Sequence, residues 1–351
     1  MKTRLFKEKN KHKLCILICF VPLLLLLTSC SSDSSTKNIN SSELPNTNKA
    51  KNKGNSTLTE NLAQTGTTIS VPSTYRLPAK QQGTVVPFEY QTKEYAGDGS
   101  ATEKTVYVYL PYGYEEKDTE TRYDILYLMH GWGGSAGEYL TGGNGRLKNM
   151  FDQMIERGDL SPTIIVSATF YTENSSKDFS SSVDELREFH QDFANDLMPA
   201  VESKFHTYAK STSKEDLTAS RDHRAFGGFS LGSVTTWMEF CYDSDYIRYF
   251  LPMSGSCWYY GGYGDYYPEK TCDFFEELIE EKDLNERGYF IYAATGTEDA
   301  VRDQVEVQME EMLKRNDVFT SDHVVYYQKE GGRHDFEAVE EYIYNALPLF
   351  F

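Results

Sequence analysis

The sequence predicts a doubly wound α/β domain with a mostly parallel sheet and helices on both faces. Three nearly continuous apolar runs are typical of strands covered on both sides, at residues 123–129, 163–170 and 288–296. Residues 183–198 and 301–313 place apolar side chains three or four positions apart, which indicates helices that follow strands. In such a fold, ligands bind beyond the carboxyl ends of the strands, so we expect the site in loops that follow strands.

The N-terminal residues 1–29 have the pattern of a lipoprotein signal peptide. Six basic residues and one acidic residue in the first thirteen positions precede the apolar run 14–27, which ends in LTSC at 27–30. This ending is a lipobox, in which Cys30 would become the lipid-bearing first residue of the mature chain. The alternative is an uncleaved membrane anchor, although the run is shorter than the ~20 residues that span a bilayer. Both alternatives predict a protein outside the cytoplasm, and the lipobox predicts a bacterial cell-surface lipoprotein.

Residues 30–78 are rich in Ser, Thr, Asn and Lys and show no sustained hydrophobic period. Such a segment buries too little apolar surface to offset its ordering entropy, so we expect a flexible tether from Cys30. Residues 79–351 contain no second stretch of this kind and predict one large domain. Near its start, residues 85–92 and 104–111 predict an antiparallel hairpin at the sheet edge.

The net charge of −18 argues against nucleic acid as a partner and favours neutral or cationic partners, such as a neutral polysaccharide. Beyond Cys30 the chain has Cys241, Cys257 and Cys272. Cys257 and Cys272 flank an aromatic loop and could form a disulfide, or could equally remain two unpaired thiols. No Cys/His spacing resembles a zinc site, and the sequence predicts neither a metal nor a cofactor.

Ser230 stands in the pattern Gly228-Phe229-Ser230-Leu231-Gly232. The preceding residues 224–229 can form a buried strand, and the following residues show a helical apolar stripe. A strand, a sharp turn and a helix are the context of a nucleophile elbow, in which small residues on either side expose the serine hydroxyl. The alternative is a glycine-rich turn with a capping serine. The context favours Ser230 as a nucleophile.

A nucleophilic serine needs a base and an orienting carboxylate. His334 lies in a loop after the strand-like run 323–328 and before the helical pattern 336–347. Glu298 and Asp299 lie just past the run 288–296, where either could reach the histidine or merely cap the next helix. Asp299 is preferred on position, and the order Ser230, Asp299, His334 is the chain order of α/β-hydrolases.

The tetrahedral intermediate of acyl transfer also needs hydrogen-bond donors for its oxyanion. The segment HGWGG at 130–134 follows a predicted buried strand, and its glycines allow the backbone to approach a substrate closely. We expect the backbone N–H groups of Trp132 and Leu231 to form the oxyanion hole. His130 would then anchor the loop rather than act as the base.

These motifs, HGWGGS at 130–135, RAFGGFSLGS at 224–233, ATGTED at 294–299 and GGRHDF at 331–336, occur in one order along residues 80–351. In this order they resemble the esterase D-like branch of α/β-hydrolases, and more narrowly the feruloyl and acetyl-xylan esterases of carbohydrate esterase family one. The resemblance implies a sheet of about eight strands, with the catalytic and oxyanion roles given above. One departure is Ser233, where the family usually has a second glycine, which puts the close packing of the helix start in doubt.

An aromatic loop at 254–270 follows the presumed elbow in sequence and contains Trp258, Tyr259 and Tyr260. Aromatic faces stack on sugar rings and phenolic acids, so these three residues are candidates for substrate binding. The alternative is a tyrosine-rich surface loop. Together with the resemblance, the loop favours a secreted esterase that cleaves feruloyl or acetyl esters of plant polysaccharides through an acyl-enzyme. Two other readings are an esterase D-like hydrolase or acyltransferase for small-molecule or siderophore esters, and a non-catalytic binding protein on a hydrolase scaffold.

Overall fold

A computed structural model of the chain describes residues 69–118, 120–141, 146–261 and 266–351. The predicted signal peptide, Cys30 and most of the predicted tether lie outside these residues. Within the four described ranges, no helix is long and apolar enough to cross a membrane.

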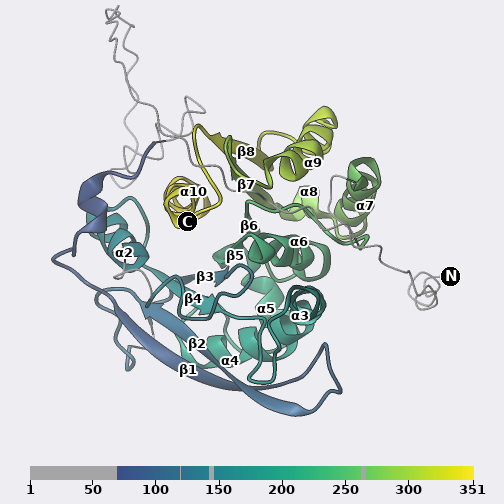
Figure 1. Cartoon of the computed structure of the whole chain (residues 1–351). Coiled ribbons are helices and arrows are strands. Elements are labelled where there is room, and N and C mark those ends of the chain that lie inside the picture. The colour runs from purple at the N-terminus through teal and green to yellow at the C-terminus, as the bar shows by residue number, and fades with distance from the viewer. Residues whose placement is uncertain (1–68, 119, 142–145, 262–265) are drawn as a thin grey trace, which may run out of the picture. The chain divides into compact units, whose positions relative to one another are not determined.

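An eight-stranded sheet forms the centre of the fold, in the order β1-β2-β4-β3-β5-β6-β7-β8 (Figure 1). The six strands from β4 to β8 in this order run parallel to their neighbours, whereas β1 pairs antiparallel with β2 and β2 antiparallel with β4. The predicted mostly parallel sheet and its edge hairpin are therefore confirmed. The strands are β1 Thr84–Lys93, β2 Ala101–Leu110, β3 Asp124–Met129, β4 Thr163–Ala168, β5 Arg224–Phe229, β6 Tyr249–Met253, β7 Phe290–Gly296 and β8 Val324–Lys329.

The apolar strands are buried on both faces because each face of the sheet has its own core. In β3, Ile125, Tyr127 and Met129 point into one core, and Leu126 and Leu128 point into the other. A period of two with both sides covered is what produces a continuous apolar run in the sequence.

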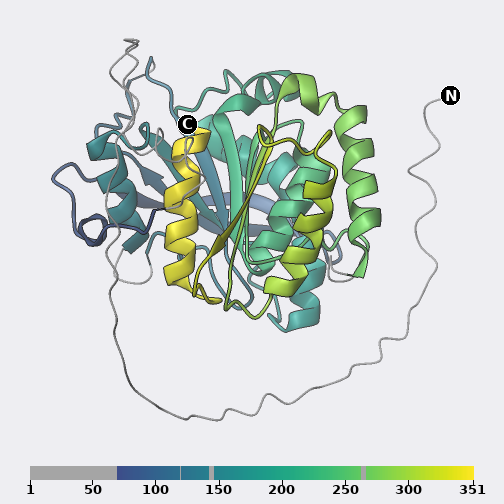
Figure 2. The ribbon, with the colours of Figure 1, turned by 90° about the horizontal axis from the view of Figure 1, so that it is seen from above.

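Helices cover both faces, as predicted. The first core contains side chains of α3, α4, α5, α6, α7, α8 and α9, and the second contains those of α2 and α10. Figure 2 shows α10 and the green C-terminal helices on opposite sides of the sheet. The α-helices are α2 Arg146–Arg157, α3 Phe179–Asp192, α4 Met198–Lys204, α5 Lys214–Ala219, α6 Leu231–Asp243, α7 Pro268–Glu281, α8 Leu284–Arg287, α9 Arg302–Lys314 and α10 Phe336–Phe350.

The helix predicted at 183–198 differs from the observed one. The observed helix, α3, begins at Phe179, because the Asp178 side chain accepts a hydrogen bond from the Ser181 N–H and caps the first turn. It ends at Asp192, and a π-helical turn at Phe193–Leu197 joins it to α4. Short 3₁₀ turns occur at Ser73–Arg76 and Arg221–His223.

The disulfide considered between Cys257 and Cys272 is not formed. Cys241, Cys257 and Cys272 are all buried free thiols. Of the two alternatives that the sequence left open, the unpaired thiols are the observed one. The core around these residues is therefore held by packing rather than by a covalent link.

Candidate active site

Ser230 occupies a sharp turn between β5 and α6, at the carboxyl edge of the sheet. Its backbone has φ 60° and ψ −118°, a conformation that is rare for a residue with a side chain. Gly228 and Gly232 make the turn possible, because a Cβ at Gly228 would collide with the backbone of Gly232, and a Cβ at Gly232 with that of Met129. The two glycines of the motif are required by close backbone contacts, and the turn presents the Ser230 hydroxyl at the start of α6.

His334 connects the Ser230 hydroxyl to a carboxylate. Its Nε2 lies 2.9 Å from Ser230 Oγ, and its Nδ1 lies 2.9 Å from Asp299 Oδ1. With Nδ1 protonated and donating to Asp299, Nε2 is free to accept the hydroxyl proton. The loops after β5, β7 and β8 thus bring together the three side chains that the sequence suggested.

Asp299, rather than Glu298, faces the histidine. Glu298 instead accepts a hydrogen bond from Arg333 Nε at 3.0 Å. Asp299 Oδ1 also accepts the Val301 N–H at 2.9 Å. Burial acts to raise the pKa of Asp299, but the hydrogen bonds from His334 and from the Val301 N–H outweigh it and hold that pKa below its ordinary value. Asp299 is therefore a carboxylate at neutral pH.

The glycine-rich loop after β3 lies against Ser230. A Cβ at Gly131 would stand 3.2 Å from Ser230 Cβ and 3.7 Å from Ser230 Oγ. Tyr171 fixes the loop, because its hydroxyl accepts the Gly133 N–H at 3.0 Å. In the part of the chain that the structure describes, the Trp132 N–H donates to no group. Leu231 is the first residue of α6, where N–H groups have no partner within the helix.

His130 supports this loop, and its ring hydrogen bonds in the described structure go to Gly131 and Thr169 rather than to Ser230. It is fully buried, with Nδ1 donating to the Gly131 carbonyl at 2.7 Å and Nε2 accepting from Thr169 Oγ1 at 2.7 Å. Burial lowers the pKa of His130 to about 4, so the imidazole is neutral. This is the anchoring position expected from the sequence.

Three neighbouring aromatic rings begin at the glycine-rich loop: the exposed Trp132 and Phe179, and the buried Trp258. The Trp132 and Phe179 rings are edge-to-face at 5.4 Å, and Phe179 lies 6.3 Å from Trp258. Trp132 and Phe179 are 56% and 41% exposed, so their faces are open to a ligand. We call these three residues the aromatic wall. Phe179 was missed by the sequence analysis, since nothing in its local pattern brings the start of α3 next to Trp132.

Tyr259 and Tyr260, the other candidates for substrate binding, pack against α7. The Tyr259 ring stacks on Phe274 at 4.2 Å. Tyr260 is edge-to-face with Tyr259 at 5.1 Å, and the Lys270 ammonium lies 3.9 Å from its ring centre. Trp258, the third predicted residue, lies next to Phe179 in the aromatic wall.

Ser233 has a structural role that the sequence did not reveal. Its hydroxyl donates to the Gly255 carbonyl at 2.8 Å, and Trp237 Nε1 donates to the same oxygen at 3.0 Å. Both bonds tie α6 to the loop that leads to Trp258. A serine is therefore compatible with the close packing of the helix start.

The described residues contain no group of three or more His, Cys, Asp or Glu side chains that could hold a metal ion.

The sheet order and the turn that carries Ser230 are together those of an α/β-hydrolase. Within this class the chain belongs to the esterase family, because the family model described as "Putative esterase" matches residues 100–347.

Known proteins refine this assignment. The chain is 36% identical over 286 residues to endo-1,4-beta-xylanase Y of Acetivibrio thermocellus, a match that covers 80% of this chain and 24% of the relative. It is 30% identical over 172 residues to an endo-1,4-beta-xylanase/feruloyl esterase of Xylanibacter ruminicola, covering 48% of this chain and 21% of the relative. The chain thus matches about a quarter of the length of these curated relatives.

A solved structure is similar over most of the chain. A serine-to-alanine mutant of the feruloyl esterase module from Clostridium thermocellum, complexed with sinapinate, is 35% identical with a TM-score of 0.67. The match covers 81% of this chain and 93% of that module. The similarity therefore extends over almost the whole module.

Proposed function

We propose that the chain is a serine esterase that hydrolyses feruloyl or acetyl esters of plant cell-wall polysaccharides through an acyl-enzyme. The observation that carries this proposal is the chain of hydrogen bonds from Ser230 through His334 to Asp299, at 2.9 Å each, beside a glycine-rich loop. The similarity to a feruloyl esterase module supports the choice of ester.

In the first half of the reaction, His334 Nε2 takes the Ser230 proton while Ser230 Oγ attacks the ester carbonyl carbon. The carbonyl oxygen becomes an oxyanion, which the N–H groups of Leu231 and Trp132 stabilise. The carbon–oxygen bond to the alcohol then breaks, and the alcohol oxygen takes the proton from His334. Asp299 stabilises the imidazolium throughout.

In the second half, water attacks the acyl-enzyme. His334 takes a proton from the water and returns it to Ser230 Oγ as the acid product leaves. No redox step or cofactor is needed, since the net reaction adds one water across the ester bond.

The aromatic wall supports a phenolic acyl group. A ferulate ring is planar, and Trp132 and Phe179 offer exposed faces and edges to such a ring beside the nucleophile. An acetyl group would leave this surface unused. We therefore expect feruloyl esters to be turned over faster than acetyl esters.

The first experiment measures release of ferulate from feruloyl arabinoxylan and of acetate from acetylated xylan by the wild type and by Ser230→Ala. We expect Ser230→Ala to lower turnover by at least about 10³-fold with an unchanged melting temperature. Ser180→Ala, which changes an exposed serine on α3, is the matched control. Activity that survives Ser230→Ala would exclude the mechanism, and wild-type enzyme that releases neither acid would redirect the search to small-molecule esters.

We further propose that the chain is a cell-surface lipoprotein, held to the membrane through Cys30 and a flexible tether. The support is the pattern of residues 1–30, and a tether would help an enzyme reach an insoluble polymer. Expressed in a bacterium, the wild type should fractionate with membranes and Cys30→Ser should be released. Membrane association that persists in Cys30→Ser would favour the uncleaved anchor instead.

A further inference from the structure

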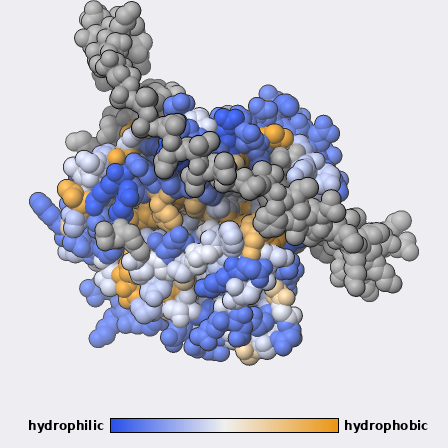
Figure 3. Space-filling view, viewed as in Figure 1, coloured by the Kyte–Doolittle hydropathy of each residue, from blue (hydrophilic) through white to orange (hydrophobic). Residues whose placement is uncertain are grey.

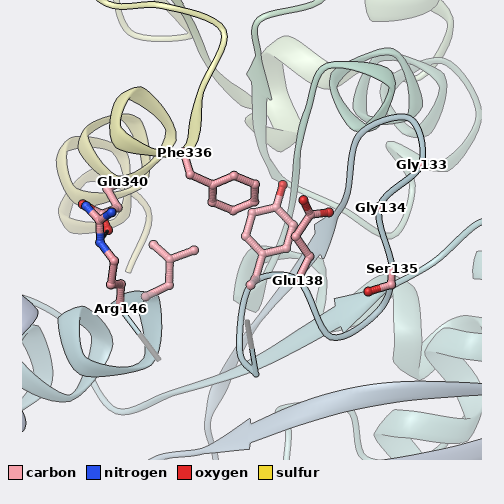
Figure 4. Close-up of a pocket in the computed structure, with 9 residues that line it drawn as sticks. Gly133, Gly134, Ser135, Glu138, Arg146, Phe336 and Glu340 are labelled. Carbon is pink, nitrogen blue, oxygen red and sulfur yellow. Dashed lines mark hydrogen bonds and ion pairs between the residues drawn. The ribbon is translucent and has the colours of Figure 1, made fainter. Parts of the chain in front are cut away.

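A cavity of about 500 Å³ lies between the glycine-rich loop, α2 and α10 (Figure 4). Its volume is within the range of about 300–1,000 Å³ that is typical of small-molecule sites. The residues that matter for its chemistry are Gly133, Glu138, Tyr139, Arg146, Phe336 and Glu340. We call it the α2–α10 cavity.

The α2–α10 cavity lies near the His334 side of the nucleophile, although Ser230 and His334 do not line it. Phe336 follows His334 by two residues, and Phe229 links the two, with its ring 4.5 Å from His334 and 6.1 Å from Phe336. Phe336 in turn lies 5.7 Å from the Tyr139 ring. Figure 4 shows the Phe336 ring between α10 and Glu138 at the cavity.

The aromatic wall and the α2–α10 cavity belong to different sides of the sheet. Phe179 begins α3, which packs on one face, whereas α2 and α10 pack on the other. Ser230 stands at the carboxyl edge between them. An ester bound at Ser230 therefore has two directions in which its two halves can extend.

The mechanism decides which half goes where. The leaving alcohol oxygen must receive its proton from His334 Nε2, so the alcohol half must lie on the His334 side. The acyl half then extends toward the aromatic wall. For a polysaccharide ester, the alcohol half is a sugar residue.

The cavity offers a hydrogen-bond acceptor to a hydroxyl group. Glu138 lines the cavity and is partly exposed, whereas its Oε2 is buried against Gly134, so the carboxylate edge away from Gly134 is the one that a ligand can reach. Burial raises the pKa of Glu138, against a hydrogen bond from backbone at Ser135 that lowers it. A carboxylate at the wall of a cavity accepts hydrogen bonds from hydroxyl groups, and a ligand hydroxyl can replace water there.

The other charges of the cavity are largely balanced. Arg146 pairs with Glu340, with Nε 2.6 Å from Oε1 and Nη2 2.8 Å from Oε2, and Arg76 Nε donates to the same carboxylate at 3.0 Å. Glu138 is the carboxylate left without a basic partner, so the cavity disfavours anions. A partly exposed Phe336 ring, an acceptor and a guanidinium edge together suit a neutral polyol.

We propose that the α2–α10 cavity binds the ester-bearing sugar residue of the substrate as the leaving group, with Glu138 accepting a sugar hydroxyl. This proposal rests on the proposed esterase function. It assigns the sugar to a site separate from the aromatic wall.

The test compares two esters of the same acid in wild type and Glu138→Gln: feruloyl arabinoxylo-oligosaccharide, which has the sugar, and methyl ferulate, which lacks it. We expect the ratio of kcat/KM for the sugar ester to that for methyl ferulate to fall about tenfold in Glu138→Gln, the effect of one charge-assisted hydrogen bond. The control Glu310→Gln removes the same charge from an exposed position on α9 and should keep the wild-type ratio. An unchanged ratio in Glu138→Gln, or an equal loss on both esters, would overturn the proposal.

A binding measurement separates this proposal from the proposed function. Titration calorimetry with an unesterified arabinoxylo-oligosaccharide, on Ser230→Ala with and without Glu138→Gln, requires no turnover. Binding that weakens with Glu138→Gln supports the sugar site even for an enzyme that releases neither ferulate nor acetate. Absence of binding, or binding indifferent to Glu138, contradicts it even where ferulate is released.

Discussion

The Asp299 carboxylate accepts hydrogen bonds from two donors that lie in different parts of the fold. Its Oδ1 accepts from His334, which precedes α10, and from the Val301 N–H, at the entrance to α9. One carboxylate thus both orients the base and holds the turn that leads into α9, although α9 has no side-chain cap. Because these bonds keep its pKa below the ordinary value, Asp299 stays ionised in mild acid.

Asp299→Asn tests the proposed role of this charge. An amide oxygen can still accept the Val301 N–H, so the fold should persist, but a neutral amide cannot stabilise the imidazolium. We expect kcat for methyl ferulate to fall about 10³- to 10⁴-fold, with the fold retained and the KM close to that of the wild type. A loss of kcat smaller than tenfold would show that Asp299 only holds the turn before α9 and does not assist His334.

The stability of the Asp299→Asn variant should also be less sensitive to acid than that of the wild type. The pKa of Asp299 in the folded chain is lower than in the unfolded chain, so its charge stabilises the fold above the unfolded pKa and this contribution is lost as the pH falls. The melting temperature of the variant should therefore lie below that of the wild type near neutral pH. The two melting temperatures should converge as the pH falls.

At the scale of single elements, the junction of β5 and α6 was predictable because its signals are local. A strand of buried residues, glycines on either side of Ser230 and a helical stripe all lie within 20 positions. Steric contacts of the backbone then force a sharp turn between β5 and α6, and this turn exposes the Ser230 side chain. The same holds for His334 and Asp299, since each lies directly after a strand that the apolar pattern reveals.

Other features could not be predicted, because their partners are distant in sequence. Ser233 bonds to a carbonyl 22 positions away. Phe179 meets Trp132 only because α3 and the loop after β3 lie at the same edge of the sheet. Tertiary packing decides both of these contacts. The π-helical turn at Phe193–Leu197 is a different case, because it precedes Pro199, which has no N–H to donate to the Asn195 carbonyl. That local signal is present in the sequence and was missed.

At the scale of the whole molecule, a largely polar face contrasts with an interior that contains two buried acidic side chains. The face in Figure 3 is largely hydrophilic, with apolar groups in small separate patches. Inside the fold, Glu239 and Asp243 lie one turn apart on α6, 0% and 5% exposed. Asp192 of α3, Asp245 and Lys282 are the charged groups near this pair.

Burial, and for Glu239 also the nearby charge of Asp243, raises the pKa of both groups, that of Glu239 well above its ordinary value and that of Asp243 to about 7. The folded chain therefore keeps protons that the unfolded chain releases above about pH 4. Since the native state then binds more protons, this pair stabilises the fold in acid, and its contribution is lost as the pH rises toward 7.

Glu239→Gln makes this pH dependence measurable, because the amide is neutral at every pH and nearly the same shape. We expect the melting temperature of the variant, relative to that of the wild type, to rise by several degrees between pH 4 and pH 8, as the wild type loses the contribution of its buried acids. Differential scanning calorimetry at a series of pH values gives this difference directly, with Glu310→Gln on the exposed face of α9 as the control. A melting-temperature difference between Glu239→Gln and the wild type that stays constant with pH would mean that both acids have ordinary pKa values and that water reaches them. A difference that grows with pH would instead show that part of the pH dependence of stability comes from α6, the helix that begins at the nucleophile.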